Sequence, residues 1–191
     1  MLRLLRVRVE AGARVCPSAA TATDIAEVER ALGLRLPAFY VRLLTEVANG
    51  GFGPGFGLIG IPPHGFIDDD LGGNLVETYL QGRACEDLAW RTPRGLLHLC
   101  NWGCGTFSYV DTLSASAAVV THDVLEDRVE YTETSVALAE WLSDWVAGVN
   151  LEDAMYETIG DRDGINPFTK KPMKIPIRRR LGRRLEFATR G

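Results

Sequence analysis

One cysteine lies close in the chain to residues that could activate a thiol. Cys104 sits in the run Trp102, Gly103, Cys104, Gly105, and His98, His122 and Asp111 are nearby. A thiol, a histidine base and an orienting carboxylate are the parts of a nucleophilic hydrolase. Reactive cysteines gain thiolate character at a helix start or beside a cation, whereas Cys104 is expected in a glycine turn between two strands. We therefore expect a buried structural cysteine, and a cysteine-dependent hydrolase is the less favoured interpretation.

Residues 50–57 are rich in glycine and suggest a phosphate-binding loop. Such a loop leaves a strand and opens a helix, so that phosphates meet the helix amino terminus. Here the glycines follow a predicted helix and precede a predicted strand, and no Lys-Ser or Lys-Thr pair follows them. The segment therefore does not predict a nucleotide cofactor.

The possible metal ligands are scattered along the chain. No two of the four cysteines show the two-residue gap of structural zinc sites, and the three histidines are not paired at helical or strand spacing. Sequence alone leaves open whether the histidines converge in space. Asp68, Asp69 and Asp70 are adjacent but lack the residue pattern of a calcium loop, so we expect a solvated acidic loop. No metal or other cofactor is predicted.

Two helical segments and a glycine turn organise the first third of the chain. Asp24 is a plausible N-cap, and the apolar spacing predicts a helix over residues 24–32 that stops at Gly33. Pro37 is expected to start a second helix that ends near Asn49. Its apolar stripe comprises Phe39, Tyr40, Leu43, Leu44 and Val47. Gly50 and Gly51 then allow a sharp turn into a buried strand over residues 57–61.

The remaining segments predict a sheet and further helices. Asn74 is expected to cap a helix that ends near Gly82, and short runs rich in β-formers predict strands over residues 96–101, 106–110, 117–122 and 129–132. Short connections favour an antiparallel meander. A helix from Thr134 or Ser135 is expected to cover the core with Leu138, Trp141, Leu142, Trp145 and Val149. Residues 6–10 alternate like a half-exposed strand, and residues 151–159 suggest a weak helix.

The order of these residues resembles the SUKH superfamily, which includes bacterial toxin-immunity proteins and fungal cell-wall-assembly regulators. The first block of the resemblance is Leu32, Gly33, Leu36, Pro37, Tyr40, Leu43, Leu44, Asn49, Gly50 and Gly51, and the second is Asn101, Trp102, Gly103, Cys104, Gly105 and Asp111. The glycine-rich insert at residues 52–56 and a basic tail depart from the pattern. The resemblance implies an α+β fold, a mainly antiparallel sheet flanked by an N-terminal helix pair and a C-terminal helix. It also implies no catalytic residues and a protein-binding surface.

Charge is divided unequally along the 191 residues. Residues 1–165 carry 12 basic and 24 acidic side chains, a net −12, whereas residues 166–191 carry 9 basic and 1 acidic, a net +8. We predict one domain over residues 1–160 and a basic, proline-containing arm over residues 161–191. The acidic body repels nucleic acid and attracts basic proteins, and the arm could bind an anionic surface or lie on the body, with the second favoured.

The expected location is the cytoplasm. No apolar run is long enough to span a bilayer, and arginines interrupt the amino terminus, which makes it a poor signal peptide. A mitochondrial transit peptide is a less favoured alternative.

The resemblance and the charge together suggest stoichiometric binding of a basic toxin domain, in many relatives a nuclease. Candidate contact residues are acids in predicted loops and one aromatic: Asp68, Asp69, Asp70, Glu86, Asp87 and Trp102. The signature residues are expected to be mostly structural. A regulatory scaffold that binds host proteins is the alternative, and the arm is expected to be dispensable for binding.

Overall fold

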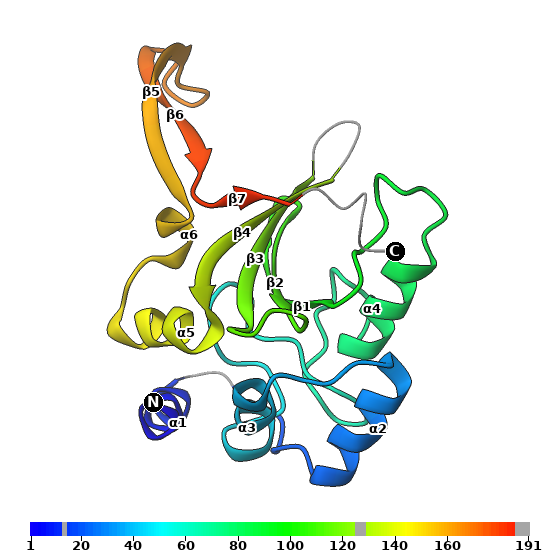
Figure 1. Ribbon diagram of the computed structural model, residues 1–191. Helices are drawn as coiled ribbons and strands as arrows, with labels where there is room; N and C mark the ends of the chain where they lie inside the picture. The colour runs from blue at the N-terminus through cyan, green and yellow to red at the C-terminus, as the bar shows by residue number, and fades with distance from the viewer. Residues whose placement is uncertain (13–14, 125–128, 186–191) are drawn as a thin grey trace.

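A five-stranded antiparallel sheet forms the centre of the computed structural model, which describes residues 1–12, 15–124 and 129–185. Helices α1, α2 and α3 gather at one end of the body, and a hairpin projects from the other (Figure 1). The helices are α1 (Leu2–Ala11), α2 (Ala22–Leu32), α3 (Ala38–Glu46), α4 (Leu75–Ala84), α5 (Leu138–Ala147) and α6 (Leu151–Ala154). This architecture confirms the predicted α+β class.

The sheet has the strand order β1-β2-β3-β4-β7, and β5 and β6 form a separate two-stranded sheet. The strands of the five-stranded sheet are β1 (Leu96–Gly103), β2 (Thr106–Asp111), β3 (Ala118–Val124), β4 (Val129–Ala137) and β7 (Arg183–Arg184). The two-stranded sheet is a hairpin of β5 (Tyr156–Ile165) and β6 (Pro172–Arg180). The first four strands are the predicted meander; β1, β2 and β3 are slightly longer than expected, and β4 continues five residues beyond its expected end at residue 132. Leu97, Leu99 and Val119 belong to the helix-covered core, whereas Tyr109 and Tyr131 belong to a second cluster with Leu185. Both faces of the sheet are therefore covered.

The predicted helix pair is present, with different ends. α2 begins two residues earlier than expected because Thr21, not Asp24, is its N-cap: Thr21 Oγ1 accepts a hydrogen bond from the Asp24 amide at 3.1 Å, and Asp24 Oδ2 accepts one from the Thr21 amide at 2.7 Å. This reciprocal pair is a capping box. α3 ends at Glu46, before the expected Asn49, and buries Tyr40, Leu43 and Leu44.

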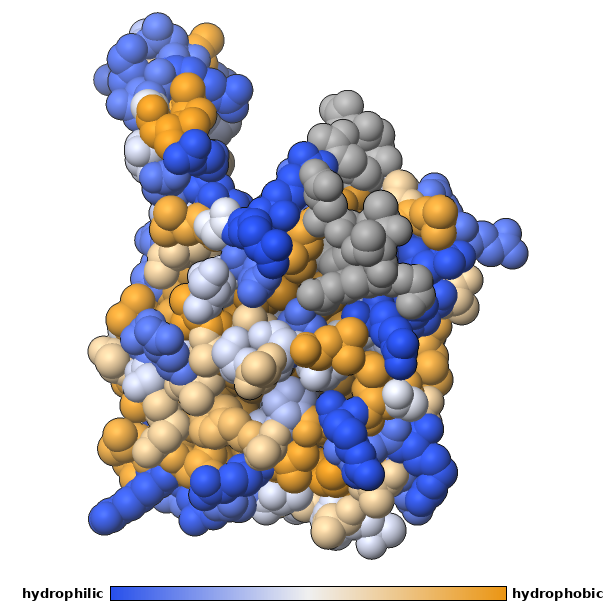
Figure 2. Space-filling view, viewed as in Figure 1, coloured by the Kyte–Doolittle hydropathy of each residue, from blue (hydrophilic) through white to orange (hydrophobic). Residues whose placement is uncertain are grey.

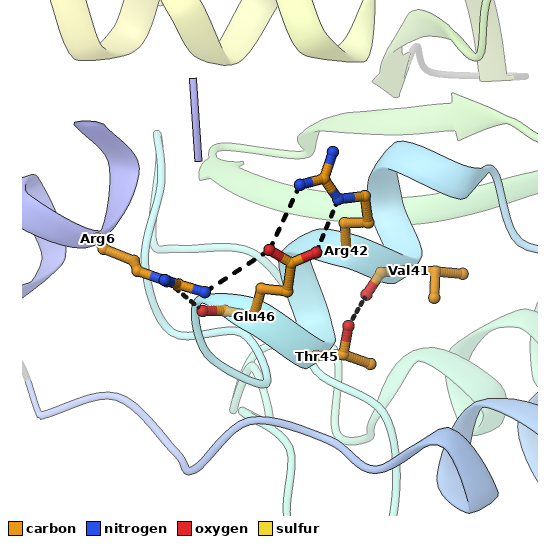
Figure 3. Close-up of polar contacts among 5 residues, drawn as sticks. All are labelled: Arg6, Val41, Arg42, Thr45 and Glu46. Carbon is orange, nitrogen blue, oxygen red and sulfur yellow. Dashed lines mark hydrogen bonds and ion pairs between the residues drawn. The ribbon is translucent and has the colours of Figure 1, made fainter. Parts of the chain in front are cut away.

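The expected strand at residues 6–10 is wrong, because this segment belongs to helix α1. Leu2, Leu5 and Val9 recur at helical spacing and face the core, and this apolar period decides the structure over the charge alternation. Figure 3 shows how α1 is held to α3: Arg6 lies 3.6 Å from Glu46 Oε2, and the other carboxylate oxygen, Oε1, accepts a 2.7 Å hydrogen bond from Arg42.

The expected strand at residues 57–61 does not form. The segment is buried, but only the Ile59 amide reaches β1, donating to the Leu99 carbonyl at 2.8 Å, and no ladder follows. Its other polar groups bind nearby loops: the Leu58 amide donates to the Phe52 carbonyl and the Gly60 amide to the Phe66 carbonyl. A short apolar run can be buried without sheet pairing when loops satisfy its backbone.

The C-terminal third differs most from expectation. β4 extends to Ala137, so α5 starts at Leu138 rather than at Thr134 or Ser135. It ends at Ala147 with Gly148 as its C-cap, which leaves Val149 outside the helix and exposed. Trp141 is buried and Trp145 is half-buried under Arg8, whose guanidinium lies 4.5 Å from the indole centroid. The weak helix expected over residues 151–159 is wrong beyond Ala154, because β5 begins at Tyr156.

The basic arm is a hairpin followed by a sheet strand. After β6, the chain returns to the body, where Arg183 and Arg184 pair with Glu133 and Thr132 of β4. Side chains add ion pairs: Arg180 with Asp123, Arg183 with Glu133 at 2.7 Å, and Arg184 with Glu130 at 2.9 Å. Of the two alternatives for the arm, the structure shows docking on the acidic body for residues 180–185. The hairpin itself projects from the body (Figure 1), and its surface is mainly hydrophilic in the view of Figure 2. The division into residues 1–160 and 161–191 stays a prediction, although β5 crosses that boundary.

Candidate protein-binding site

Residues of the first signature block hold the segment between α3 and β1 in place through buried hydrogen bonds. Asn49 binds the backbone of Ile61 twice: its Nδ2 donates to the carbonyl at 2.9 Å, and its Oδ1 accepts from the amide at 2.8 Å. The buried Tyr40 hydroxyl donates to the Ile59 carbonyl at 3.2 Å. A Cβ on Gly50, whose φ is +83°, would lie 2.6 Å from the Leu58 carbonyl oxygen, so glycine is required there. Tyr40, Asn49 and Gly50 therefore hold residues 58–61 in place next to α3.

The glycine segment, residues 52–57, lies directly against the end of β1. The Phe56 amide donates to the Asn101 carbonyl at 2.8 Å, and a Cβ on Gly55 would lie 2.3 Å from that same oxygen. On the other side, a Cβ on Gly103 would meet the Phe56 ring at 3.5 Å. The insert that departs from the signature is thus fitted to Asn101 and Gly103, two residues of the second signature block.

Asn101 also holds the acidic loop, which we define as Asp68, Asp69 and Asp70. Its Nδ2 lies 3.3 Å from both Asp68 Oδ1 and Asp70 Oδ2. Asp68 Oδ1 further accepts from the amides of Asp70 at 3.0 Å and Leu71 at 3.3 Å. Asp68 is 3% exposed, and its Oδ2 is buried without a hydrogen-bond donor among the described residues. Asp68 is therefore a loop-forming residue, whereas Asp69 and Asp70 are exposed.

A surface cavity of about 380 Å³ joins these two segments, and we call it the acidic pocket. It is lined by Val15, Phe56, Phe66, Ile67, Asp68, Asp69 and Asp70. Phe56 is 43% and Ile67 50% exposed, so apolar walls stand beside the carboxylates. Aromatic and aliphatic walls with a few polar groups are typical of binding sites. Within the described parts of the chain, no three His, Cys, Asp or Glu side chains are placed to hold a metal ion.

The other predicted contact residues do not join the acidic pocket. Glu86 and Asp87 are exposed, but they follow α4, whose ten residues place them roughly 15 Å from the end beside the acidic loop. Trp102 is half-buried, its indole N–H donates to Ser108 Oγ at 2.9 Å, and its ring stands edge-on to Trp141 at 6.3 Å. Trp102 thus has a packing role in this structure. Asp111 is buried, and its Oδ1 accepts from the Leu113 amide at 2.9 Å.

The parts of the thiol hydrolase are not brought together. Cys104 is exposed, with φ at +51°, so the expectation that it is buried is wrong. His98 and His122 are buried on the sheet, and His98 Nε2 is hydrogen-bonded to the Tyr109 hydroxyl at 2.8 Å. Among the described residues, no hydrogen bond joins Cys104 to a histidine.

The two buried histidines form an aromatic cluster that sequence reasoning missed. His122 lies 5.4 Å from Tyr109 and 5.1 Å from Tyr131, measured between ring centroids. Burial lowers the pKa of His98 to about 3 and that of His122 to about 4, so both are neutral at pH 7. The signal was present in the sequence, because His98 and His122 lie within the strand runs. Only strand register reveals that they share one face.

A second cavity, of about 420 Å³, lies between α1, the glycine segment and α5. Its lining includes Arg8, Cys16, Phe52, Gly53 and Trp145 but no carboxylate. Because its charged group is a cation, it does not fit a basic partner, and the acidic pocket remains the better candidate.

The protein is an α+β domain in which α3, the glycine turn after it and β1 form a frame. This frame supports the acidic pocket, which has apolar walls. The model of the SMI1 / KNR4 family (SUKH-1) matches residues 19–144, about two thirds of the chain, and the protein belongs to this family. The predicted resemblance is thereby confirmed. Neither a curated protein nor a solved structure gives a significant match.

Family membership supports a binding role, in toxin immunity or in regulation, at the level of the family. No helix in the described residues has the length and apolar character needed to cross a membrane.

Proposed function

We propose that the protein neutralises a cognate basic toxin in the cytoplasm by stoichiometric, non-catalytic binding through the acidic loop. The observation that carries the proposal is the acidic pocket itself. Asp69 and Asp70 are exposed beside the apolar side chains of Phe56 and Ile67, and neither carboxylate forms an ion pair with a described residue. Carboxylates next to exposed aromatic surface are suited to bind a cationic protein.

The arm strengthens this choice of surface. Its arginines already neutralise Asp123, Glu130 and Glu133 on β3 and β4. The charge of the acidic loop is not used in this way and remains available to a partner. A net −12 over residues 1–165 also steers a basic protein toward the body, and a nuclease toxin carries its positive charge where it binds phosphate.

The test measures association of the full chain with the product of the neighbouring gene by stopped flow, across a salt series. The variant is Asp69→Lys/Asp70→Lys, which leaves the structural Asp68 in place. The control is Glu86→Lys/Asp87→Lys, the same charge change at the far end of α4. We expect the first variant to slow association markedly at low salt and less at high salt, because exposed charges are screened.

Equal slowing by both variants would contradict a local site, since it would reflect net charge alone. A one-to-one complex that abolishes toxin activity supports immunity. A partner without toxic activity would instead indicate the regulatory scaffold.

A further inference from the structure

We propose that the acidic pocket receives one arginine side chain of the protein partner, which anchors the complex. The inference rests on the proposed function, and it adds the chemistry of the residue that is recognised. It follows from the walls of the pocket, from its unused acceptors and from the way in which the glycine segment is fitted to it.

The walls suit a long cationic side chain. Phe56 and Phe66 supply aromatic surface, and Val15 and Ile67 supply aliphatic surface around the same cavity. An arginine packs its methylene stem on apolar surface and stacks its planar guanidinium on aromatic faces. A small inorganic cation would gain no favourable contact from such apolar walls.

The floor offers acceptors that the protein itself does not satisfy. Asp68 is almost fully buried and lines the pocket, yet its Oδ2 receives no donor from the described residues. Asp70 Oδ2 receives one long bond, from Asn101 at 3.3 Å, and Asp69 is exposed at the rim. A buried acceptor left unpaired is unfavourable, so a donor that reaches it is bound more strongly than at a surface carboxylate.

The geometry favours arginine over lysine. A guanidinium presents several N–H donors in a planar fork and can bind two acceptors at once, whereas an ammonium is a compact, strongly hydrated charge. Here Asn101 holds Asp68 and Asp70 together through one amide nitrogen, so their carboxylates form a pair of acceptors. The pair and the aromatic walls match the two binding modes of a guanidinium.

The glycine segment explains why the pocket exists in this chain. Its Phe56 amide is bound to the Asn101 carbonyl, so the residue that holds the carboxylates also holds the aromatic wall. Gly55 permits this contact because any side chain there would collide with the Asn101 carbonyl oxygen. The insert thus has a role in binding that the signature residues do not supply.

The first experiment titrates N-acetyl-L-arginine amide into the isotope-labelled full chain and follows amide chemical shifts by NMR. We expect saturable shifts at Asp70, Leu71 and Gly103, weaker binding of the lysine amide, and no saturable shifts with the uncharged citrulline amide. Asp70→Asn and Phe56→Ala should each weaken arginine binding roughly tenfold. The matched controls are Asp87→Asn, an exposed carboxylate in another loop, and Phe168→Ala, an exposed aromatic in the hairpin, and both should bind as the wild type does.

Equal binding of citrulline and arginine amides, or shifts away from these residues, would overturn the proposal. The same variants are then tested against the neighbouring gene product. Loss of both arginine and partner binding supports the anchor. Loss of arginine binding with unchanged partner binding overturns the anchor and leaves the proposed function standing. If the arginine amide binds but no basic protein does, the pocket chemistry holds and the proposed function fails.

Discussion

At the scale of single residues, Tyr40, Leu43 and Asn49 of the family signature are buried and hold the fold together. Tyr40 and Asn49 bind the backbone of residues 59–61, and Leu43 is fully buried between α3 and the core. The binding chemistry that we propose comes from other positions, in the acidic loop and the glycine segment. In this chain, the buried signature residues and the proposed contact residues are therefore different sets.

Leu43→Ala tests the frame. Because its side chain is 0% exposed, we expect the free energy of unfolding to fall by roughly 2–5 kcal/mol, as for other large-to-small core changes. Phe39→Ala on the same helix is the control, and its half-buried side chain should cost less. Urea denaturation measures both. An unchanged midpoint for Leu43→Ala would show that this face of α3 does not carry the packing.

The buried histidines make stability depend on pH. Their pKa values in the folded protein lie below the ordinary value of 6.5, so both are neutral when folded and their contribution is complete above pH 6.5. As pH falls from 6.5 toward 4, the unfolded chain binds protons that the folded chain does not, and stability is lost. At pH 5 the loss is about 2 kcal/mol for each histidine.

His122→Gln should remove the part of this pH dependence that is due to His122. The measurement is the difference in free energy of unfolding between variant and wild type at pH 7.5 and pH 5, which cancels the titration of unrelated carboxylates. The difference should shrink by about 2 kcal/mol at the lower pH. A constant difference would mean that His122 is accessible to protons in the folded state.

Cys104→Ser tests the enzymatic alternative. Because Cys104 is exposed and no hydrogen bond joins it to a histidine in the part of the chain that the structure describes, we expect unchanged binding and a change in stability within about 0.5 kcal/mol. The assays are partner binding and denaturation. A hydrolytic activity lost on this substitution, with the fold intact, would restore the thiol mechanism.

At the scale of elements, the arm depends on one well-buried ion pair. The Arg180 side chain is 9% exposed, pairs with Asp123 and lies 4.7 Å from the Tyr156 ring centroid. Arg178, on the same strand, is 47% exposed and pairs with Asp153 at 3.0 Å. These two arginines differ mainly in burial, which makes them a matched pair for substitution.

Arg180→Ala should lower the free energy of unfolding by roughly 1.5–3 kcal/mol, because Asp123 loses charged hydrogen bonds. Arg178→Ala should cost less than about 1 kcal/mol, as exposed pairs do. Guanidinium denaturation compares them. Equal effects would show that the Arg180 pair is as solvated as the surface pair.

The elements also show what the sequence could predict. Repeated apolar spacing around Leu43 and the short β-rich runs identified α3 and the meander, because both signals are local. The prediction for residues 6–10 was wrong because alternating Arg and Val resemble a strand, whereas the helical spacing of Leu2, Leu5 and Val9 appears only when the preceding residues are included. The acidic pocket was only partly foreseen: the acidic loop was identified, but its link to Phe56 depends on Asn101, and no sequence pattern reports that tertiary contact.

At the scale of the whole molecule, the end of the basic arm binds to the acidic body through β7 and ion pairs. β7 pairs with β4, and Leu185 covers Tyr131 and Tyr109 in the second cluster. The arm is therefore expected to contribute to stability even if it is dispensable for binding.

Truncation after residue 165 separates these two contributions. The free energy of unfolding should fall, because β4 loses its pairing with β7 and the second cluster loses Leu185. Association with a basic partner at low salt should become faster, because net charge changes from −4 to −12, and the gain should vanish near about 0.5 M salt. Denaturation and stopped-flow mixing measure the two effects. Loss of binding on truncation, with the fold retained, would place the arm in the interface.

The glycine segment is attached to β1 in a way that tolerates changes of side chain. Residues 52–57 reach β1 through a main-chain bond, from the Phe56 amide to the Asn101 carbonyl, and such a bond does not depend on the identity of the side chain. Substitutions at Phe56 can therefore reshape the pocket wall while the frame stays folded. Under the proposed function, a change at Phe56 would alter the contact with the partner without breaking the main-chain bond that holds this segment to β1.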